Sequence, residues 1–151
     1  MAFLHPRSTA TIAGHPIHPM LVPFPIVCFI LVLVSDIAYW RTSNLMWHDF
    51  SSWLLLAGIV MGALAALVGA VDFLARREVR AQRPAWPHAI GNVVVMILAI
   101  LNSFVHAGDG WTAIVPWGLV LSAATVLLLL VTGWLGGSLV YRHGVGVDHH
   151  G

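Results

Sequence analysis

The chain has 151 residues, of which 59% are hydrophobic and only 9% are charged, and its formal net charge is +1. Its mean hydropathy is +0.88. In an ordinary soluble domain about a quarter of the residues are charged. This composition therefore excludes an ordinary soluble domain. The small net charge and the absence of lysine exclude a nucleic-acid-binding surface. The length allows a single domain, residues 1–151.

Four hydrophobic stretches are each long enough to cross a bilayer as a helix, which takes about 20 residues. They cover residues 20–40, 53–74, 88–107 and 114–140. Because the connections between them are short, neighbouring helices should be antiparallel. The sequence therefore predicts an all-α integral membrane protein, a four-helix up-down bundle surrounded by the lipid bilayer. The first stretch is too long for the apolar core of a signal peptide, so we expect it to be retained.

The positions of the arginines predict the orientation of these spans. Six of the seven fall on one side of the predicted bundle: Arg7, Arg76, Arg77, Arg80, Arg83 and Arg142. The positive-inside rule then places both termini in the cytoplasm, with the protein in a bacterial inner (plasma) membrane. Tryptophans, which favour the interface, gather at the other ends of the spans: Trp40, Trp47, Trp53, Trp111 and Trp117. A homo-oligomer is compatible with this arrangement.

Ionisable residues inside the spans are few, and in lipid such residues usually have a partner or a function. His15 and His18 lie in a Pro-containing segment just before the first span. Because proline favours extended backbone in the residue before it, we expect neither histidine to lie inside a regular helix. Pro19 suits the first turn of a helix, which predicts that His18 lies at the entry of one. The third span has a polar face formed by His88, Asn92, Asn102, Ser103 and His106. His88 and His106 are 18 residues apart, about 27 Å along a helix, so one should lie near each membrane surface.

The second and fourth spans have small residues at helical spacing. These are Gly58, Gly62, Ala65 and Gly69, followed by Asp72, and Gly118, Ser122, Thr125, Leu129, Thr132 and Gly136. Such rows usually allow helices to approach closely, and they also make room for a flat ligand. Asp72 and Arg76 are four residues apart, which predicts an ion pair at the end of a helix.

Imidazoles on the odd-numbered spans and small residues on the even-numbered spans suit a planar cofactor held within the bundle. The leading hypothesis is a b-type cytochrome-like electron carrier with one haem b, ligated by His18 or His15 together with His88. Asn92 would supply an orienting hydrogen bond. A second haem would need His106 and His48. The candidate cofactor-binding residues are His15, His18, His88, Asn92 and Asp36, and the candidate metal ligands are His18, His88 and His106. Electrons would be exchanged with a quinone or a redox partner protein.

Two alternatives remain open. The first is a small transporter or a proton or ion pathway through Asp36, His88 and His106, although residues 93–101 are entirely apolar, which argues against an open pore. The second is a non-redox scaffold subunit that docks a partner helix through its small residues. No catalytic motif is recognisable, and no catalytic residue is predicted.

Three segments resemble one family of bacterial membrane proteins of unknown function, domain of unknown function 2231. They are His15-Pro16-Ile17-His18-Pro19, His88-Ala89-Ile90-Gly91-Asn92, and the stretch from Gly133 to Val147 that contains Gly-Trp-Leu-Gly-Gly-Ser-Leu-Val-Tyr and Gly-Val-Gly-Val. The resemblance implies the same four-span architecture. It also implies that the functional positions of the family correspond in this chain to His15, His18, Asp36, His88 and Asn92. Members of this family are sometimes joined to Rieske-type or dehydrogenase modules, which implies electron transfer. We expect any redox partner of this chain to be a separate protein.

Overall fold

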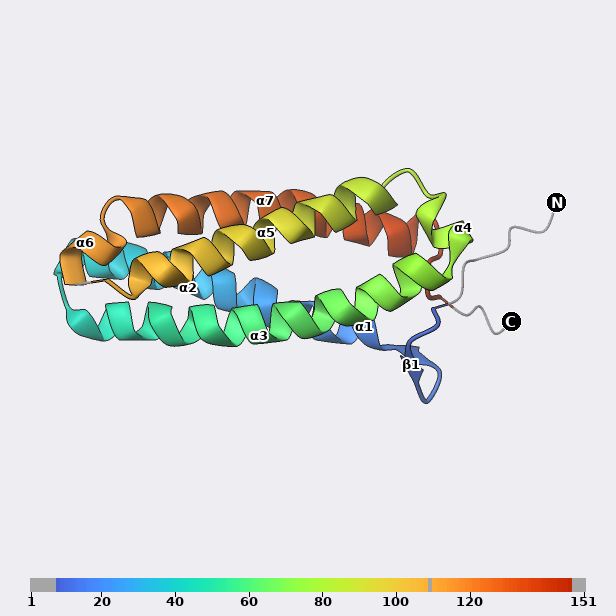
Figure 1. Cartoon of the computed structure of the whole chain (residues 1–151), viewed down its shortest axis with the longest axis horizontal. Helices are drawn as coiled ribbons and strands as arrows, with labels where there is room; N and C mark the ends of the chain where they lie inside the picture. The colour runs from blue at the N-terminus through green and yellow to red at the C-terminus, as the bar shows by residue number, and fades with distance from the viewer. Residues whose placement is uncertain (1–7, 109, 148–151) are drawn as a thin grey trace.

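The computed structural model describes residues 8–108 and 110–147. Four long helices run up and down the bundle: α2 (Pro23–Thr42), α3 (Leu45–Ala75), α5 (Ala85–His106) and α7 (Trp117–Tyr141) (Figure 1). The short elements are the hairpin β1 (Thr11–Ile12) and β2 (His15–Pro16), and the helices α1 (Ile17–Leu21), α4 (Arg77–Arg80) and α6 (Gly110–Ile114). Within the described residues, four helical stretches are long and apolar enough to cross a membrane: Ile17–Thr42, Leu45–Ala75, Ala85–His106 and Thr112–Tyr141. The predicted all-α membrane bundle is confirmed.

The second span begins earlier than its hydropathy suggests, at Leu45 rather than at residue 53. Ser43 turns the chain with a φ of 53°. The side chain of Asn44 then accepts a hydrogen bond from the backbone N–H of Met46 at 3.0 Å. A side-chain cap of this kind starts a helix regardless of the polarity of its first turns. The polar residues His48 and Asp49 therefore lie on α3 and not in a loop.

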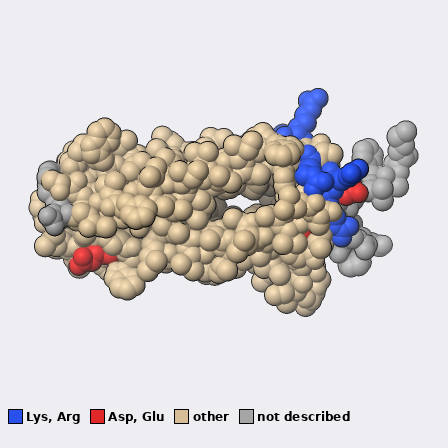
Figure 2. Space-filling model, in the orientation of Figure 1, with Lys and Arg blue, Asp and Glu red and all other residues tan. Residues whose placement is uncertain are grey.

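The bundle consists of two closely packed helix pairs, α2 with α3 and α5 with α7. Glycines allow close approach within and between these pairs. A Cβ added to Gly58 would lie 2.6 Å from the Phe29 ring, and one added to Gly62 would lie 2.7 Å from Met96 Sδ. The predicted packing role of the small residues on the second span is thus confirmed at these two positions. Figure 2 shows an opening between the two pairs, near the end where the arginines gather.

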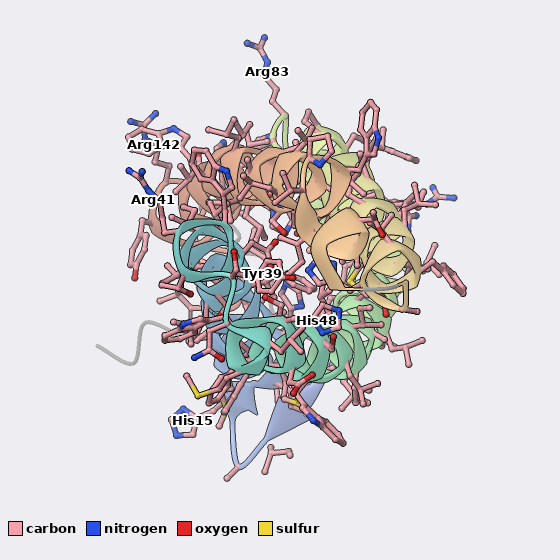
Figure 3. All side chains as sticks on the ribbon, turned by 90° about the vertical axis from the view of Figure 1, so that its left-hand side faces the viewer. His15, Tyr39, Arg41, His48, Arg83 and Arg142 are labelled. Carbon is pink, nitrogen blue, oxygen red and sulfur yellow. The ribbon has the colours of Figure 1, made fainter. Side chains whose placement is uncertain are left out.

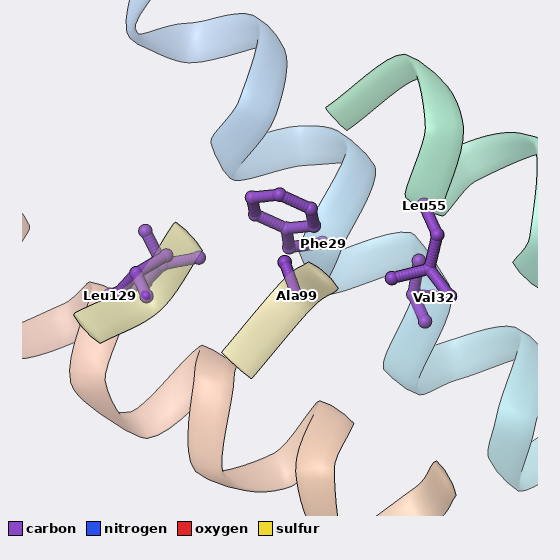
Figure 4. Close-up of a cluster of buried hydrophobic side chains, with 6 residues drawn as sticks. Phe29, Val32, Leu55, Ala99 and Leu129 are labelled. Atoms are coloured by element: carbon purple, nitrogen blue, oxygen red, sulfur yellow. The ribbon is translucent and has the colours of Figure 1, made fainter. Parts of the chain in front are cut away.

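An apolar cluster occupies the middle of the bundle (Figure 4). Its buried members are Phe29, Val32, Leu55, Val95, Ala99 and Leu129, which come from all four long helices. This cluster separates the polar interior residues into two groups, one at each end of the bundle. We call these ends the arginine-rich end, which carries α4, and the opposite end, which carries α6 (Figure 1).

Asp72 fixes the N-terminal segment at the arginine-rich end. Its carboxylate accepts hydrogen bonds from Ser8 Oγ at 2.5 Å, from the Thr9 N–H at 2.5 Å and from the Ala10 N–H at 3.1 Å. Arg76 donates its Nε–H to Thr9 Oγ1 at 2.9 Å. The predicted Asp72–Arg76 ion pair is therefore wrong, because backbone donors from a distant segment take the carboxylate. The hairpin that leads to His18 is thereby tied to the end of α3.

Candidate functional site

His18 lies on α1 at the arginine-rich end, and its ring is anchored to α3. Its Nδ1 is 2.8 Å from the backbone oxygen of Ala65. His18 does lie in a helix, because α1 runs from Ile17 to Leu21, and it lies in the first turn, as the prediction of a helix entry with Pro19 requires. The helix tolerates Pro19 because the first N–H groups of a helix have no partner within it. One short turn of helix therefore sets the direction of the His18 ring.

His88 lies in the first turn of α5, and its ring is anchored to α7. Its Nδ1 is 2.9 Å from the backbone oxygen of Thr132. The amide Nδ2 of Asn92 donates to the backbone oxygen of His88 at 2.8 Å and lies 3.3 Å and 3.4 Å from the two ring nitrogens. The Asn92 amide is therefore within hydrogen-bond distance of the imidazole, and the ring Nδ1–H donates to the backbone oxygen of Thr132.

The two imidazoles face each other from different helix pairs. Their ring centroids are 6.3 Å apart, and the ring planes are perpendicular, at 89°. A carbonyl oxygen can only accept, so each Nδ1 bears the hydrogen and each Nε2 carries a lone pair in the neutral ring. The Nε2 of His88 lies 3.4 Å from Asn92 Nδ2. Metal-binding histidines typically show this pattern, in which one nitrogen donates to a carbonyl and the other is left for the metal.

Glycines make room for both rings. A Cβ added to Gly69 would lie 2.8 Å from His18 Nδ1, and a Cβ added to Gly136 would lie 2.9 Å from His88 Cε1. These distances are shorter than side-chain contacts allow. Gly69 on the second span and Gly136 on the fourth span, the last glycines of the two rows of small residues, thus each lie against one imidazole of the pair.

Replacing Gly136 by alanine is expected to displace the His88 ring and to destabilise the protein by about 1–3 kcal/mol, as overpacking does. Gly133 lies one turn away on the same helix, and nothing lies within 4 Å of a Cβ added there. Gly133→Ala should therefore be neutral or stabilising by up to about 1 kcal/mol. Denaturant unfolding of both variants checks the prediction, and equal stabilities would contradict the proposed contact.

The structure does not bring His15 to this pair. His15 lies on β2 with an exposed side chain. Figure 3, which looks along the bundle from the opposite end, shows His15 at the periphery. Of the two histidines in the Pro-containing segment, only His18 lies against the interior.

Asp36 is also separate from the histidine pair, because it belongs to a second polar cluster at the opposite end. Its side chain has no exposed surface. Its Oδ1 accepts from Ser51 Oγ at 2.5 Å and contacts His106 Nε2 at 3.0 Å, and its Oδ2 accepts from Ser122 Oγ. Asn102 Nδ2 donates to Ser122 Oγ at 2.8 Å. We call these residues the Asp36 cluster: Asp36, Ser51, Asn102, His106 and Ser122.

Both ring nitrogens of His106 have protein partners, which disfavours the second haem site considered above. Nδ1 is 3.0 Å from the backbone oxygen of Asn102, and Nε2 contacts Asp36. His48 stacks on His106 with ring centroids 6.1 Å apart, but its Nε2 is 3.1 Å from the backbone oxygen of His106. These two imidazoles therefore bind protein oxygens and do not share an open space.

The candidate metal ligands His18, His88 and His106 are accordingly divided between the two ends. Among the described residues, no group of three or more His, Cys, Asp or Glu side chains is arranged to hold a metal ion. Sequence reasoning missed Ser51, because it falls in a stretch that hydropathy assigned to a loop. It treated Ser122 as a packing residue, although serine on a membrane helix is also a hydrogen-bond donor.

The comparisons with known proteins agree with the membrane architecture and give no activity. No curated protein and no solved structure matches the chain. A family model described as "Predicted membrane protein (DUF2231)" matches residues 14–149, which is nearly the whole chain. The chain therefore belongs to this family of membrane proteins, DUF2231.

Proposed function

We propose that this protein binds one haem b between His18 and His88 and carries electrons within the membrane. The observation that carries the proposal is the geometry of this pair, with centroids 6.3 Å apart and perpendicular planes. Bonds from a metal to imidazole nitrogen are about 2.0–2.1 Å long, and each ring centroid lies about 1.1 Å beyond its nitrogen. Two imidazoles on opposite sides of one metal ion therefore have centroids about 6.3 Å apart.

The surroundings of the pair suit a flat, largely apolar group. His18 is held by α3 and His88 by α7, so a ligand between them would lie between the two helix pairs. Gly69 and Gly136 keep the rings free of side chains on their helix-facing sides. These contacts fix both rings in advance, which reduces the entropy lost on binding.

A groove lies between α2 and α7, and its lining includes neither His18 nor His88. Its volume is about 500 Å³, and its lining includes Gly133, Gly137, Ser138, Tyr141 and Arg142. Gly133 and Gly137 directly follow Thr132 and Gly136, the two α7 residues that contact His88. Arg142 supplies a cation for the acidic substituents that haem carries.

Two histidine ligands leave no open coordination position, and haem bound in this way supplies a site for a single electron. The role proposed for this chain is therefore electron transfer, with a membrane quinone or a separate redox protein as partner. By the positive-inside rule, the arginine-rich end, and with it the His18–His88 pair, would face the cytoplasm. The membrane would then be the bacterial inner membrane.

An absorption spectrum tests the proposal directly. Protein purified from haem-replete cells should be red, and dithionite should sharpen its absorption bands in the manner of a six-coordinate b-type cytochrome. Pyridine extraction should yield one haem per chain. A colourless protein that also fails to take up added haemin would contradict the proposal.

The alternative of a transmembrane proton or ion pathway has less support. Asp36 and His106 lie at the opposite end from His88, and the apolar cluster lies between them. A continuous file of polar groups would be needed for such a pathway. No contact of the described residues specifically favours a scaffold subunit.

A further inference from the structure

The groove between α2 and α7 opens on the outer surface of the bundle. Its lining includes Leu130 and Trp134, which are 63% and 74% exposed. Nothing lies within 4 Å of a Cβ added to Gly133, which also lines the groove. Gly136, which lies against the His88 ring in the interior, is not part of the lining. In a membrane the groove therefore faces lipid rather than the histidine pair.

The groove is polar at one end only. The lining residues from Val126 to Gly137 have no hydroxyl group and no charge, and Ile26 and Ile30 add apolar side chains from α2. The hydroxyl and charged residues of the lining all lie at the arginine-rich end: Ser138, Tyr141 and Arg142. Tyrosine is enriched at the interface between a membrane and water. The groove thus suits a ligand with a long apolar tail and a polar head.

The length of the groove matches one leaflet of a bilayer. Val126 and Arg142 are 16 residues apart, about 24 Å along a helix. A bilayer with its headgroups is about 40–45 Å thick, so one leaflet measures about 20–22 Å. A groove that has its polar end in the headgroup region therefore extends to about the middle of the bilayer, as an acyl chain does.

Arg142 gives the polar end a positive charge that is not used within the bundle. No hydrogen bond or ion pair joins its guanidinium to another described residue. In contrast, Arg76 donates to Thr9, and Arg80 donates to backbone oxygens at the end of α3. Figure 3 shows Arg142 at the periphery of the bundle. A free guanidinium at this place is complementary to a phosphate group, which it can bind through two parallel hydrogen bonds.

The polar end decides which membrane molecule the groove prefers. Lipid tails are as apolar as leucine, so an acyl chain gains little in the groove over the surrounding lipid. The head of a quinone has neutral carbonyl groups, and a zwitterionic headgroup carries its own cation, which competes for the phosphate. A headgroup with a net negative charge has no such internal cation. Charge complementarity with Arg142 therefore favours an anionic phospholipid.

We propose that the groove between α2 and α7 is a binding site for one anionic phospholipid. An acyl chain lies over Gly133 and Gly137, the hydroxyls of Ser138 and Tyr141 donate to the ester oxygens, and Arg142 binds the phosphate. By the positive-inside rule this lipid belongs to the cytoplasmic leaflet. A guanidinium has five N–H donors, so the phosphate leaves donors for a haem carboxylate. This inference does not depend on haem.

Native mass spectrometry of the full-length protein tests the proposal. The protein is released from detergent micelles that contain phosphatidylglycerol or phosphatidylcholine with identical acyl chains. The first phosphatidylglycerol should bind at least about tenfold more tightly than the first phosphatidylcholine, as expected for a hydrogen bond to a charged group. Arg142→Gln should remove this preference. Arg83→Gln makes the same change at an exposed arginine outside the lining, and it should alter the affinity less than about twofold.

A second variant tests the apolar part of the groove and leaves Arg142 in place. Gly133→Leu puts a side chain into the groove without a clash, because the position is open. It should weaken the binding of the first phosphatidylglycerol at least about tenfold, since burial of one or two CH₂ groups accounts for such a factor. Val131→Leu is the control, because Val131 is exposed on the same helix but does not line the groove. This control should leave the affinity unchanged.

The result that overturns the proposal differs for each variant. The two lipids could bind equally well, Arg142→Gln and Arg83→Gln could have equal effects, or Gly133→Leu could leave the affinity for phosphatidylglycerol intact. Displacement of the first phosphatidylglycerol by ubiquinone or by haemin would make that molecule the occupant. A dimer that Gly133→Leu dissociates would make the groove a contact between two copies of the chain. Any one of these results contradicts a site for an anionic phospholipid.

Discussion

Replacing His88 by alanine is expected to abolish stable haem binding. The change removes one of the two imidazoles whose geometry carries the proposed function. The other described histidine on the α7 side, His143, contacts the Ser138 backbone oxygen through its Nδ1. Loss of a residue that only supports a ligand costs about 10–100-fold in metal affinity, so loss of the ligand itself should cost more than about 100-fold. Titration with haemin, followed by absorbance, measures the effect.

Two controls separate ligation from a structural role of His88. His15→Ala removes an exposed histidine from the same end and should leave the spectrum unchanged. Free imidazole should restore a six-coordinate spectrum to His88→Ala, because the variant leaves a ring-sized space beside Gly136. If His88→Ala binds haemin as tightly as the unmodified chain, the assignment of His88 as a ligand is wrong.

Replacing Asp36 by alanine is expected to destabilise the fold by about 3–5 kcal/mol, the cost of removing one partner from a buried ion pair. The change leaves His106 Nε2, Ser51 Oγ and Ser122 Oγ without their shared acceptor at a site with no exposed surface. Unfolding in mixed detergent micelles, followed by circular dichroism, measures the loss.

The matched control is Asp49→Ala, since the side chain of Asp49 is 76% exposed. Its effect should stay within about 0.5 kcal/mol, as for most surface substitutions. A double-mutant cycle with His106→Ala should give a coupling energy of about 0.5–3 kcal/mol. Additive effects of the two changes would show that Asp36 and His106 do not interact in the membrane.

The sequence alone determined the architecture of this protein. Four apolar stretches of membrane length and a one-sided distribution of arginines leave few alternatives to a four-helix bundle, because every backbone polar group in lipid must be satisfied within the helices. Hydropathy failed only at the start of α3, where the Asn44 cap extends the helix through polar residues. The periodicity of the third span also placed Asn102 and His106 correctly in the interior.

Only the tertiary structure decided which polar residues meet. Helical spacing gives the face and the depth of a residue on its own span, but it contains no information on the rotation of one span relative to the next. That rotation pairs His18 with His88 and Asp36 with His106, and it leaves His15 outside. It depends on close contacts such as those of Gly69 and Gly136 with the two rings, which involve residues more than forty positions apart. The apolar cluster between the two groups then makes them separate sites rather than one pathway.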